Sequence, residues 1–182
     1  ARLFEPTRAG TILTDHQGPA TGLSLSDAGR VASVDERGRL LITDLAGEAI
    51  AEHALPPGKN LQLFASPDRR LFAAADLAWT DRLGDGRVAV SAAGPGTVVL
   101  GSFDSTRPTT ISMTAAIRDL VWLPDGRGVF VALADGALRR VDLDGTVTEI
   151  DHLPSPLMSV AVSPDGTQVA VGADDGTVRA TT

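Results

Sequence analysis

Short runs of apolar residues recur along the chain, and each is closed by a turn of small and polar residues. Four such runs end in turns that align at Ser26, Ser66, Leu123 and Ser163, so that the intervals are 40, 57 and 40 residues. Ser163-Pro-Asp-Gly166 is typical of a tight strand reversal, because proline presets φ, aspartate bonds to the backbone and glycine accepts a positive φ. The pattern therefore predicts a repeated unit of about 40 residues built from short strands.

Each unit is expected to hold up to four strands. Second strands are predicted at 30–34, 71–75, 128–133 and 168–172, where near-continuous apolar runs indicate burial on both faces. Third strands are predicted at 39–43, 87–91, 137–141 and 177–180, and fourth strands at 48–54, 97–101 and 146–150. In the second unit Gly86 is expected to mark the turn before the third strand, and the Thr-rich segment 102–116 a rim loop or a spacer. No segment has sustained helical periodicity, so the predicted fold class is all-β.

A period of about 40 to 45 residues is the length of a four-stranded propeller blade. The sequence thus predicts a β-propeller of about four four-stranded blades. The expected domain is a single partial propeller over 1–182, with blades at approximately 1–20 (partial), 21–55, 60–101, 117–151 and 157–182 (partial). Both ends of the chain fall on a predicted third strand. If the two ends met in a closed four-bladed ring, the blade that they share would have two third strands. We therefore expect the chain to be part of a larger ring that another chain or a further segment completes.

The repeats resemble the WD-repeat β-propeller family, whose blades end their third strand with Trp-Asp. The Asp position holds Glu5, Asp44 and Asp142, whereas the Trp position holds Phe4, Thr43, Val141 and Thr181, so the motif is degenerate and its tryptophan is missing. His16, His53 and His152 loosely echo the family's Gly-His pair. A related propeller type with Ser-Pro-Asp-Gly turns, as in periplasmic translocation proteins or peptidase propeller domains, remains open at this point.

Composition narrows the range of partners. The formal net charge of −7 argues against nucleic acid as the partner, and no apolar run approaches the length of a membrane span. The absence of cysteine excludes disulfides and thiolate zinc sites. The chain begins without a methionine or a signal-length apolar stretch, which suggests a processed or excised piece. We expect neither a cofactor nor a metal, and a cytoplasmic location.

Few residues carry candidate chemistry, because nucleophile and phosphate-loop motifs are absent from the sequence. The three histidines lack metal-ligand spacing and are expected to cap turns, and Asp174-Asp175 is expected to form a hairpin turn. Trp122 is expected in the core. Trp79, with Asp81 and Arg82, lies in the inserted loop of the second unit and is the candidate protein-binding site, although Trp79 folding back over its blade is the alternative.

The resemblance implies a non-catalytic scaffold or sensor that binds proteins, since propellers hold variable loops on a rigid disc. In bacterial proteins such arrays resemble modules attached to signalling or defence effectors, and we expect this chain to be bacterial and to act in an oligomer. One alternative is the propeller domain of an enzyme, a hydrolase or dehydrogenase with a site in the central channel. The other is a purely architectural role.

Overall fold

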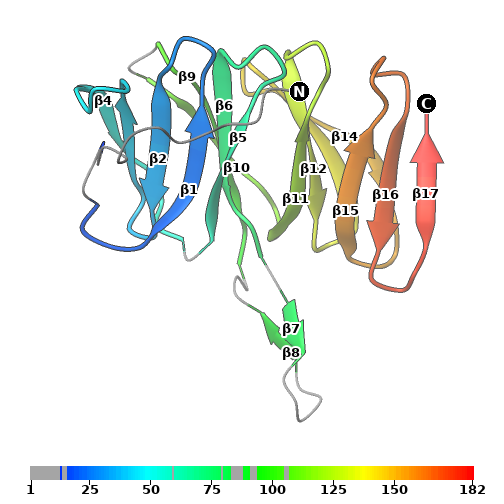
Figure 1. Ribbon diagram of the computed structural model, residues 1–182. Helices are drawn as coiled ribbons and strands as arrows, with labels where there is room; N and C mark the ends of the chain where they lie inside the picture. Colours follow the sequence, from blue (N-terminus) through cyan, green and yellow to red (C-terminus); the bar gives the residue numbers. More distant parts are fainter. Residues whose placement is uncertain are drawn as a thin grey trace, which may run out of the picture.

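The strands form successive β-sheets that are arranged in an arc. The computed structural model describes residues 13, 16–58, 60–78, 80–82, 88–90, 94–104 and 107–182. Every regular element among them is a β-strand. Three four-stranded sheets and one three-stranded sheet follow one another in chain order, and a two-stranded hairpin projects from the row (Figure 1). The all-β prediction is confirmed, and the described part contains no helix long and apolar enough to cross a membrane.

Neighbouring strands within each sheet are antiparallel. The first sheet holds β1 (Ala20–Leu25), β2 (Val31–Asp35), β3 (Arg39–Thr43) and β4 (Ala49–Ala54), in that order. The third holds β11 (Ile117–Trp122), β12 (Gly128–Leu133), β13 (Ala137–Asp142) and β14 (Val147–His152), and the fourth holds β15 (Leu157–Val162), β16 (Val169–Ala173) and β17 (Val178–Thr181). These strands match the sequence predictions to within a few residues, and the described fourth sheet is three-stranded.

The second sheet differs from the prediction. It is ordered β10-β9-β6-β5, with β5 (Leu61–Ala65), β6 (Leu71–Asp76), β9 (Thr97–Ser102) and β10 (Thr109–Ser112). The predicted third strand at 87–91 is wrong, because β8 (Val88–Val90) pairs with β7 (Thr80–Arg82) in a sheet of their own. The segment 97–101 is the third strand rather than the fourth, since β9 pairs with β6. The supposed rim loop at 102–116 contains the fourth strand, so this sheet extends to Ser112, past the expected blade end at residue 101.

Glycine turns set the spacing between second and third strands. In the third sheet Gly136 has φ of 93°, and its amide donates to the carbonyl of Leu133 at 3.1 Å. A Cβ at this position would meet the Leu153 carbonyl, so the backbone of the following segment lies directly against the turn. Gly38 repeats both features in the first sheet. Only glycine satisfies this conformation and this close approach together.

The core lies between the sheets. Three clusters of buried apolar side chains fill the junctions between successive sheets, and alanines such as Ala73, Ala74 and Ala75 are fully buried, which allows close stacking. Trp122 lies in the cluster between the second and third sheets, as predicted. The inner strands β2, β6 and β12 are nearly all buried. A sheet covers each face of β6 and β12, whereas on β2 one face meets the second sheet and the other carries Ser33 and Asp35, which bond to the His16 ring.

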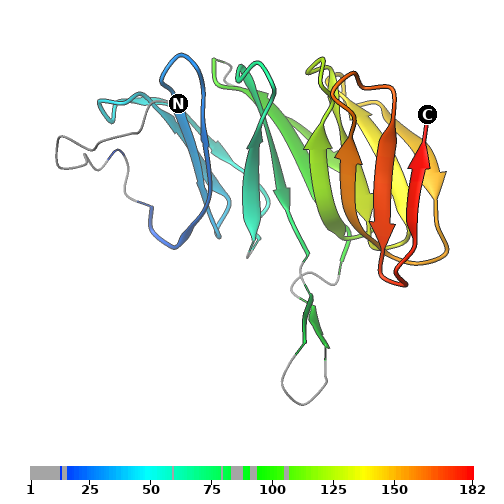
Figure 2. The same ribbon diagram turned by 45° about the vertical axis from the view of Figure 1, so that its right-hand side comes forward.

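The row of sheets is an open arc in the described part of the chain. Figures 1 and 2 show the first and fourth sheets at opposite ends, with the second and third between them. Neighbouring sheets contact through their first strands, β1 with β5, β5 with β11 and β11 with β15. This is the arrangement of propeller blades about an axis, with the first strands innermost.

Candidate protein-interaction site

The hairpin β7–β8 is inserted between β6 and β9, where the other sheets have a tight turn between their second and third strands. Strand β6 ends at Asp76, and Leu77 and Ala78 are held against the next sheet by a parallel bridge from Leu77 to Ile117 and by the amide of Ala78, which donates to the Ile117 carbonyl at 2.7 Å. Beyond this anchor the hairpin extends away from the edge of the arc, as Figures 1 and 2 both show. It pairs with neither sheet that flanks it.

The sequence-predicted binding residues are partly placed. Asp81 and Arg82 lie on β7, which pairs with β8 in register, Asp81 opposite Ala89 and Arg82 opposite Val88. Trp79 lies outside the described residues. The assignment of Trp79, Asp81 and Arg82 to protein binding stays a prediction, and the structure adds that β7 belongs to a projecting hairpin rather than to a blade.

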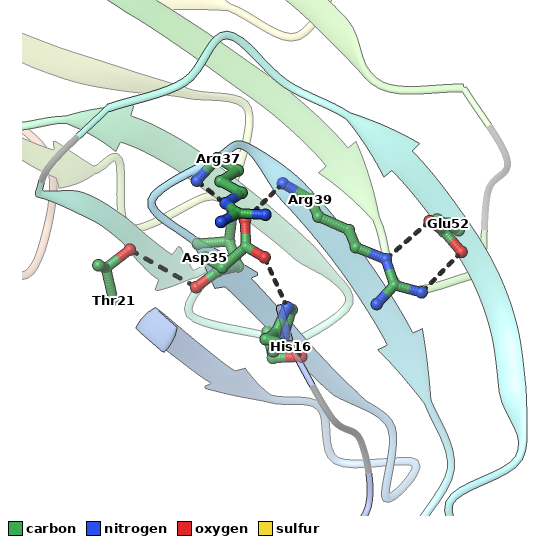
Figure 3. A network of polar contacts seen from close by, with 8 residues as sticks. His16, Thr21, Asp35, Arg37, Arg39 and Glu52 are labelled. Atoms are coloured by element: carbon green, nitrogen blue, oxygen red, sulfur yellow. Dashed lines mark hydrogen bonds and ion pairs between the residues drawn. The ribbon is translucent and has the colours of Figure 1, made fainter. Parts of the chain in front are cut away.

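A buried polar network fixes the turn between β2 and β3 (Figure 3). The carboxylate of Asp35 accepts hydrogen bonds from the backbone amides of Arg37 at 3.0 Å and Arg39 at 2.9 Å. With Nδ1 protonated, the His16 ring donates to Asp35 Oδ2 at 3.3 Å, and its Nε2 accepts from the Ser33 hydroxyl at 2.9 Å. All three side chains are buried, so the network connects the segment before β1 to the turn.

Electrostatics keep Asp35 ionised. Burial by itself raises the pKa of this carboxyl, but the amides of Arg39 and Arg37 and the His16 ring together hold the pKa below its usual value. Next to Asp35, Arg39 makes a bidentate ion pair with Glu52 (Figure 3): its Nε donates to Oε1 at 2.8 Å and its Nη2 donates to Oε2 at 3.3 Å. This ion pair lowers the pKa of Glu52. The role of the Asp35 carboxylate is structural, because it accepts hydrogen bonds from the backbone of the turn.

The other histidines do not repeat this arrangement. The Nε2 atom of His53 is buried with no hydrogen-bond partner among the described residues, and His152 is half-exposed, with Nδ1 at 3.8 Å from Glu149 Oε1. The His16 ring thus contacts the turn only through the side chain of Asp35, which caps it, and among the described contacts neither His53 nor His152 caps a turn with its ring. The sequence signal for the network is the polar pair Ser33 and Asp35 within an otherwise apolar buried strand, which sequence reasoning missed.

The predicted hairpin turn at Asp174-Asp175 is confirmed. Asp175 Oδ1 accepts from the Thr177 amide at 2.9 Å, and the Gly176 amide donates to the Ala173 carbonyl at 3.1 Å. Within the described ranges, no three His, Asp or Glu side chains are grouped so that they would hold a metal ion.

A charged hollow lies between the first two sheets. Its volume is about 590 Å³, and it opens between the turn after β1, the turn after β5 and the end of β9. Arg30 donates to the Phe103 carbonyl at 3.1 Å and forms an ion pair with Asp104, while Arg69 Nε lies 3.7 Å from Asp27 Oδ1 on the neighbouring sheet. Cations and carboxylates alternate around the hollow, so it joins two blades rather than presenting a surface of one charge.

Arg69 has an unusual backbone conformation. Its φ of 51° is the one positive value found for a non-glycine residue in the described part of the chain. The matching turns place Gly29, Gly126 and Gly166 at this position, with φ of 73°, 69° and 72°. A side chain in the left-handed region costs about 1–2 kcal/mol. The exposed 3.7 Å contact with Asp27 offsets only part of this cost.

We predict that Arg69→Gly raises the free energy of unfolding by about 0.5–1 kcal/mol, because relief of the backbone cost exceeds the loss of one exposed ion pair. Urea unfolding followed by circular dichroism measures the change. Arg70→Gly is the matched control: Arg70 also lies in this exposed turn but has no positive φ, so glycine there gives no gain. Equal effects of the two variants would show that the conformation of Arg69 carries no cost.

Comparison with known proteins agrees with this geometry. Residues 144–180 match the family model described as WD domain, G-beta repeat. This match begins in the turn before β14 and ends within β17, so it covers one fourth strand and the three strands of the next sheet. No curated protein matches the sequence.

Two solved structures of designed proteins share the arrangement of strands. The crystal structure of the computationally designed Ika4 protein matches with a TM-score of 0.67 and 20% identity, over 96% of this chain and 97% of that chain. The computationally designed Ika8 protein matches with a TM-score of 0.64 and 20% identity, over 91% of this chain and 46% of that one. The chain thus spans less than half of the Ika8 chain, and both matches concern the fold alone.

Proposed function

Because the chain is a WD-repeat-like β-propeller, we propose that it is a non-catalytic scaffold or sensor module that binds a specific protein partner. WD repeats are in general protein-interaction modules, and the geometry adds a specific element that serves this purpose. The observation that carries the proposal is the hairpin β7–β8, which interrupts a blade without joining its sheet. An element that contributes nothing to blade pairing and projects from a rigid scaffold is well placed for recognition.

The chemistry of the chain favours a protein partner over nucleic acid or a membrane. A net charge of −7 opposes binding to phosphates or to anionic lipids. The described ion pairs, such as Arg39 with Glu52 and Arg139 with Glu149, place arginines beside carboxylates, so their positive charge is locally balanced. The cytoplasmic location, the bacterial source and the absence of catalysis are parts of the same proposal and rest on the sequence.

We predict that the hairpin is dispensable for folding and required for binding. Replacing 79–93 with a short Gly-Ser linker retains Leu77 and Ala78 and all strands of the four blade sheets. The free energy of unfolding should change by no more than about 0.5 kcal/mol, since surface changes outside the packed sheets are usually of this size. Partner affinity should fall at least about tenfold, because a few central residues carry most of the binding energy.

The binding measurement uses a partner found with the intact chain. A protein retained from an extract of the source cells by the immobilised chain is identified, purified and titrated against the native chain, the linker variant, Trp79→Ala, Asp81→Ala and Arg82→Ala. Thr110→Ala on the exposed strand β10 is the control, outside the hairpin but on the same blade. Unchanged affinity of the linker variant, with the native chain still binding, would remove the hairpin from the site.

A further inference from the structure

The fourth sheet leaves uncovered a face that every earlier sheet buries. We call the face of a sheet that packs on the next sheet its forward face. On the third strand, Leu40, Val98 and Leu138 occupy matching forward positions in the first three sheets and are at most 1% exposed. Val178 occupies the same position in the fourth sheet and is 78% exposed. Exposure of a valine at a position that is otherwise fully buried indicates a missing neighbour.

The first strand of the first sheet is uncovered on the complementary side, whereas Val31, Ser33 and Leu41 behind it are buried. We call the face that packs on the preceding sheet the backward face. On the first strand, Leu63, Leu120 and Val160 occupy matching backward positions and are 9%, 3% and 8% exposed. Leu23 occupies that position in the first sheet and is 70% exposed, and Leu25, two residues on, is 46% exposed.

These two positions are partners wherever sheets meet. Leu40 and Leu63 share the cluster between the first and second sheets, Val98 and Leu120 share the next cluster, and Leu138 and Val160 share the third. The chain therefore makes the same forward-to-backward contact three times. Val178 and Leu23 are the two halves of a fourth contact of this kind.

The exposed side chains at the two ends of the arc differ in size in a complementary way. The forward face of the fourth sheet carries small residues around Val178, including Ala161 and Ala180, which are exposed, and Gly172. The first strand of the first sheet projects two leucines. Small side chains opposite two leucines would allow the close packing that buried alanines allow between the other sheets.

We propose that a second copy of this chain covers both faces, so that two arcs close into one ring in which Val178 of each copy meets Leu23 of the other. One arc cannot make this contact with itself, because its first and fourth sheets stand at opposite ends (Figures 1 and 2). Each copy carries one exposed Leu23 and one exposed Val178, and two copies joined head to tail cover both residues of each copy. The proposal deepens the proposed function, since it rests on a propeller that requires further blades, and it names what completes the propeller.

Native mass measurement of the full chain is the first test. The ring predicts a particle of two chains, twice the 18.8 kDa of one. Leu23→Asp and Val178→Asp should each raise the dissociation constant at least about 100-fold, because each would bury an unpaired carboxylate at the contact. Both residues are exposed in a single arc, so the monomers should keep the native circular dichroism. Leu45→Asp is the matched control, an exposed leucine in the turn after β3 that lies on neither end face.

Cross-linking shows whether Leu23 and Val178 meet between two copies or within one chain. The chain has no cysteine, so Leu23→Cys and Val178→Cys give single thiols. Mild oxidation of a mixture of the two variants should join one copy to the other, whereas either variant alone should give little product. A disulfide within one chain of the double variant, or a monomeric native chain at micromolar concentration, would overturn the proposal. The linker variant that lacks the hairpin should still pair, so loss of partner binding and loss of the ring are separate results.

Discussion

Replacing Trp122 with alanine is expected to lower the free energy of unfolding by about 3–5 kcal/mol, the range measured when large aromatic side chains are removed from a core. Trp122 is 6% exposed and lies on β11 within the cluster that joins the second and third sheets. Its indole Nε1 donates to the carbonyl of Phe64 on β5 at 2.9 Å. The side chain thus supplies both apolar contact and a polar link between two blades, and its loss should weaken the middle of the arc.

Trp122→Phe separates these two contributions. Phenylalanine retains most of the apolar contact but cannot donate, so the Phe64 carbonyl loses this hydrogen bond. The expected loss is about 0.5–1.5 kcal/mol, the net contribution of one hydrogen bond, with some further loss from the smaller ring. Urea unfolding followed by far-ultraviolet circular dichroism measures both variants. A loss of less than about 1 kcal/mol for Trp122→Ala would contradict the account of this junction as a packed core.

The second large effect is expected at Asp35. Asp35→Ala should lower the free energy of unfolding by about 2–3 kcal/mol, because hydrogen bonds to a charged group are strong and the amides of Arg37 and Arg39 lose their acceptor in a buried site. Asp175→Ala is the control, since Asp175 accepts from the Thr177 amide in the same kind of turn but at an exposed position. Its replacement should cost about 1 kcal/mol or less.

The same carboxyl gives stability a defined pH dependence. The pKa of Asp35 is lower in the folded protein than in the unfolded chain, because the two amides and His16 outweigh the effect of burial. A carboxyl of this kind stabilises the fold fully above its unfolded pKa of about 3.9, and the contribution is lost as the pH falls through that value towards the folded pKa. The native chain should therefore lose stability below about pH 4 more steeply than Asp35→Asn. Parallel curves for the two proteins would exclude Asp35 as a source of the slope.

Turn chemistry explains why three of the four sheets could be predicted from the sequence. Gly38, Gly136 and Gly176 have positive φ at the turns between second and third strands, and turns with this requirement leave a visible glycine at a constant distance. The apolar runs between such turns then fall on the correct strands. Local signals sufficed because each of these strands pairs with its neighbour in sequence.

The second sheet could not be predicted in this way. The triplet Val88-Ala-Val90 has the same local pattern as a blade strand, yet it pairs with β7, while Val98, Val99 and Leu100 take the blade position. Which of two apolar runs joins a sheet depends on long-range packing, and the run that does so here is buried on both faces. One signal in the sequence is the continuity of the 97–101 run, because a strand covered on both faces has no need to alternate.

The candidate site was accessible to sequence reasoning only in part. An insertion relative to the 40-residue period located Trp79, Asp81 and Arg82, but the period does not show where the inserted segment pairs. The buried network of His16, Ser33 and Asp35 joins positions on either side of β1, and no spacing rule predicts such a contact. The exposure of Leu23 and Val178 follows from the order of the sheets and is visible only once their faces are assigned.

The central claim is that packing between blade faces stabilises this chain, and that a second copy packs in the same way on the exposed residues of its two end sheets. Hydrogen exchange of the backbone amides, measured by mass spectrometry at low and high protein concentration, tests it most directly. The account predicts that peptides from β1 and β17, which carry Leu23 and Val178, gain protection at high concentration, while peptides from β12 in the third sheet are protected equally at both. Equal protection of all three strands at both concentrations would contradict it.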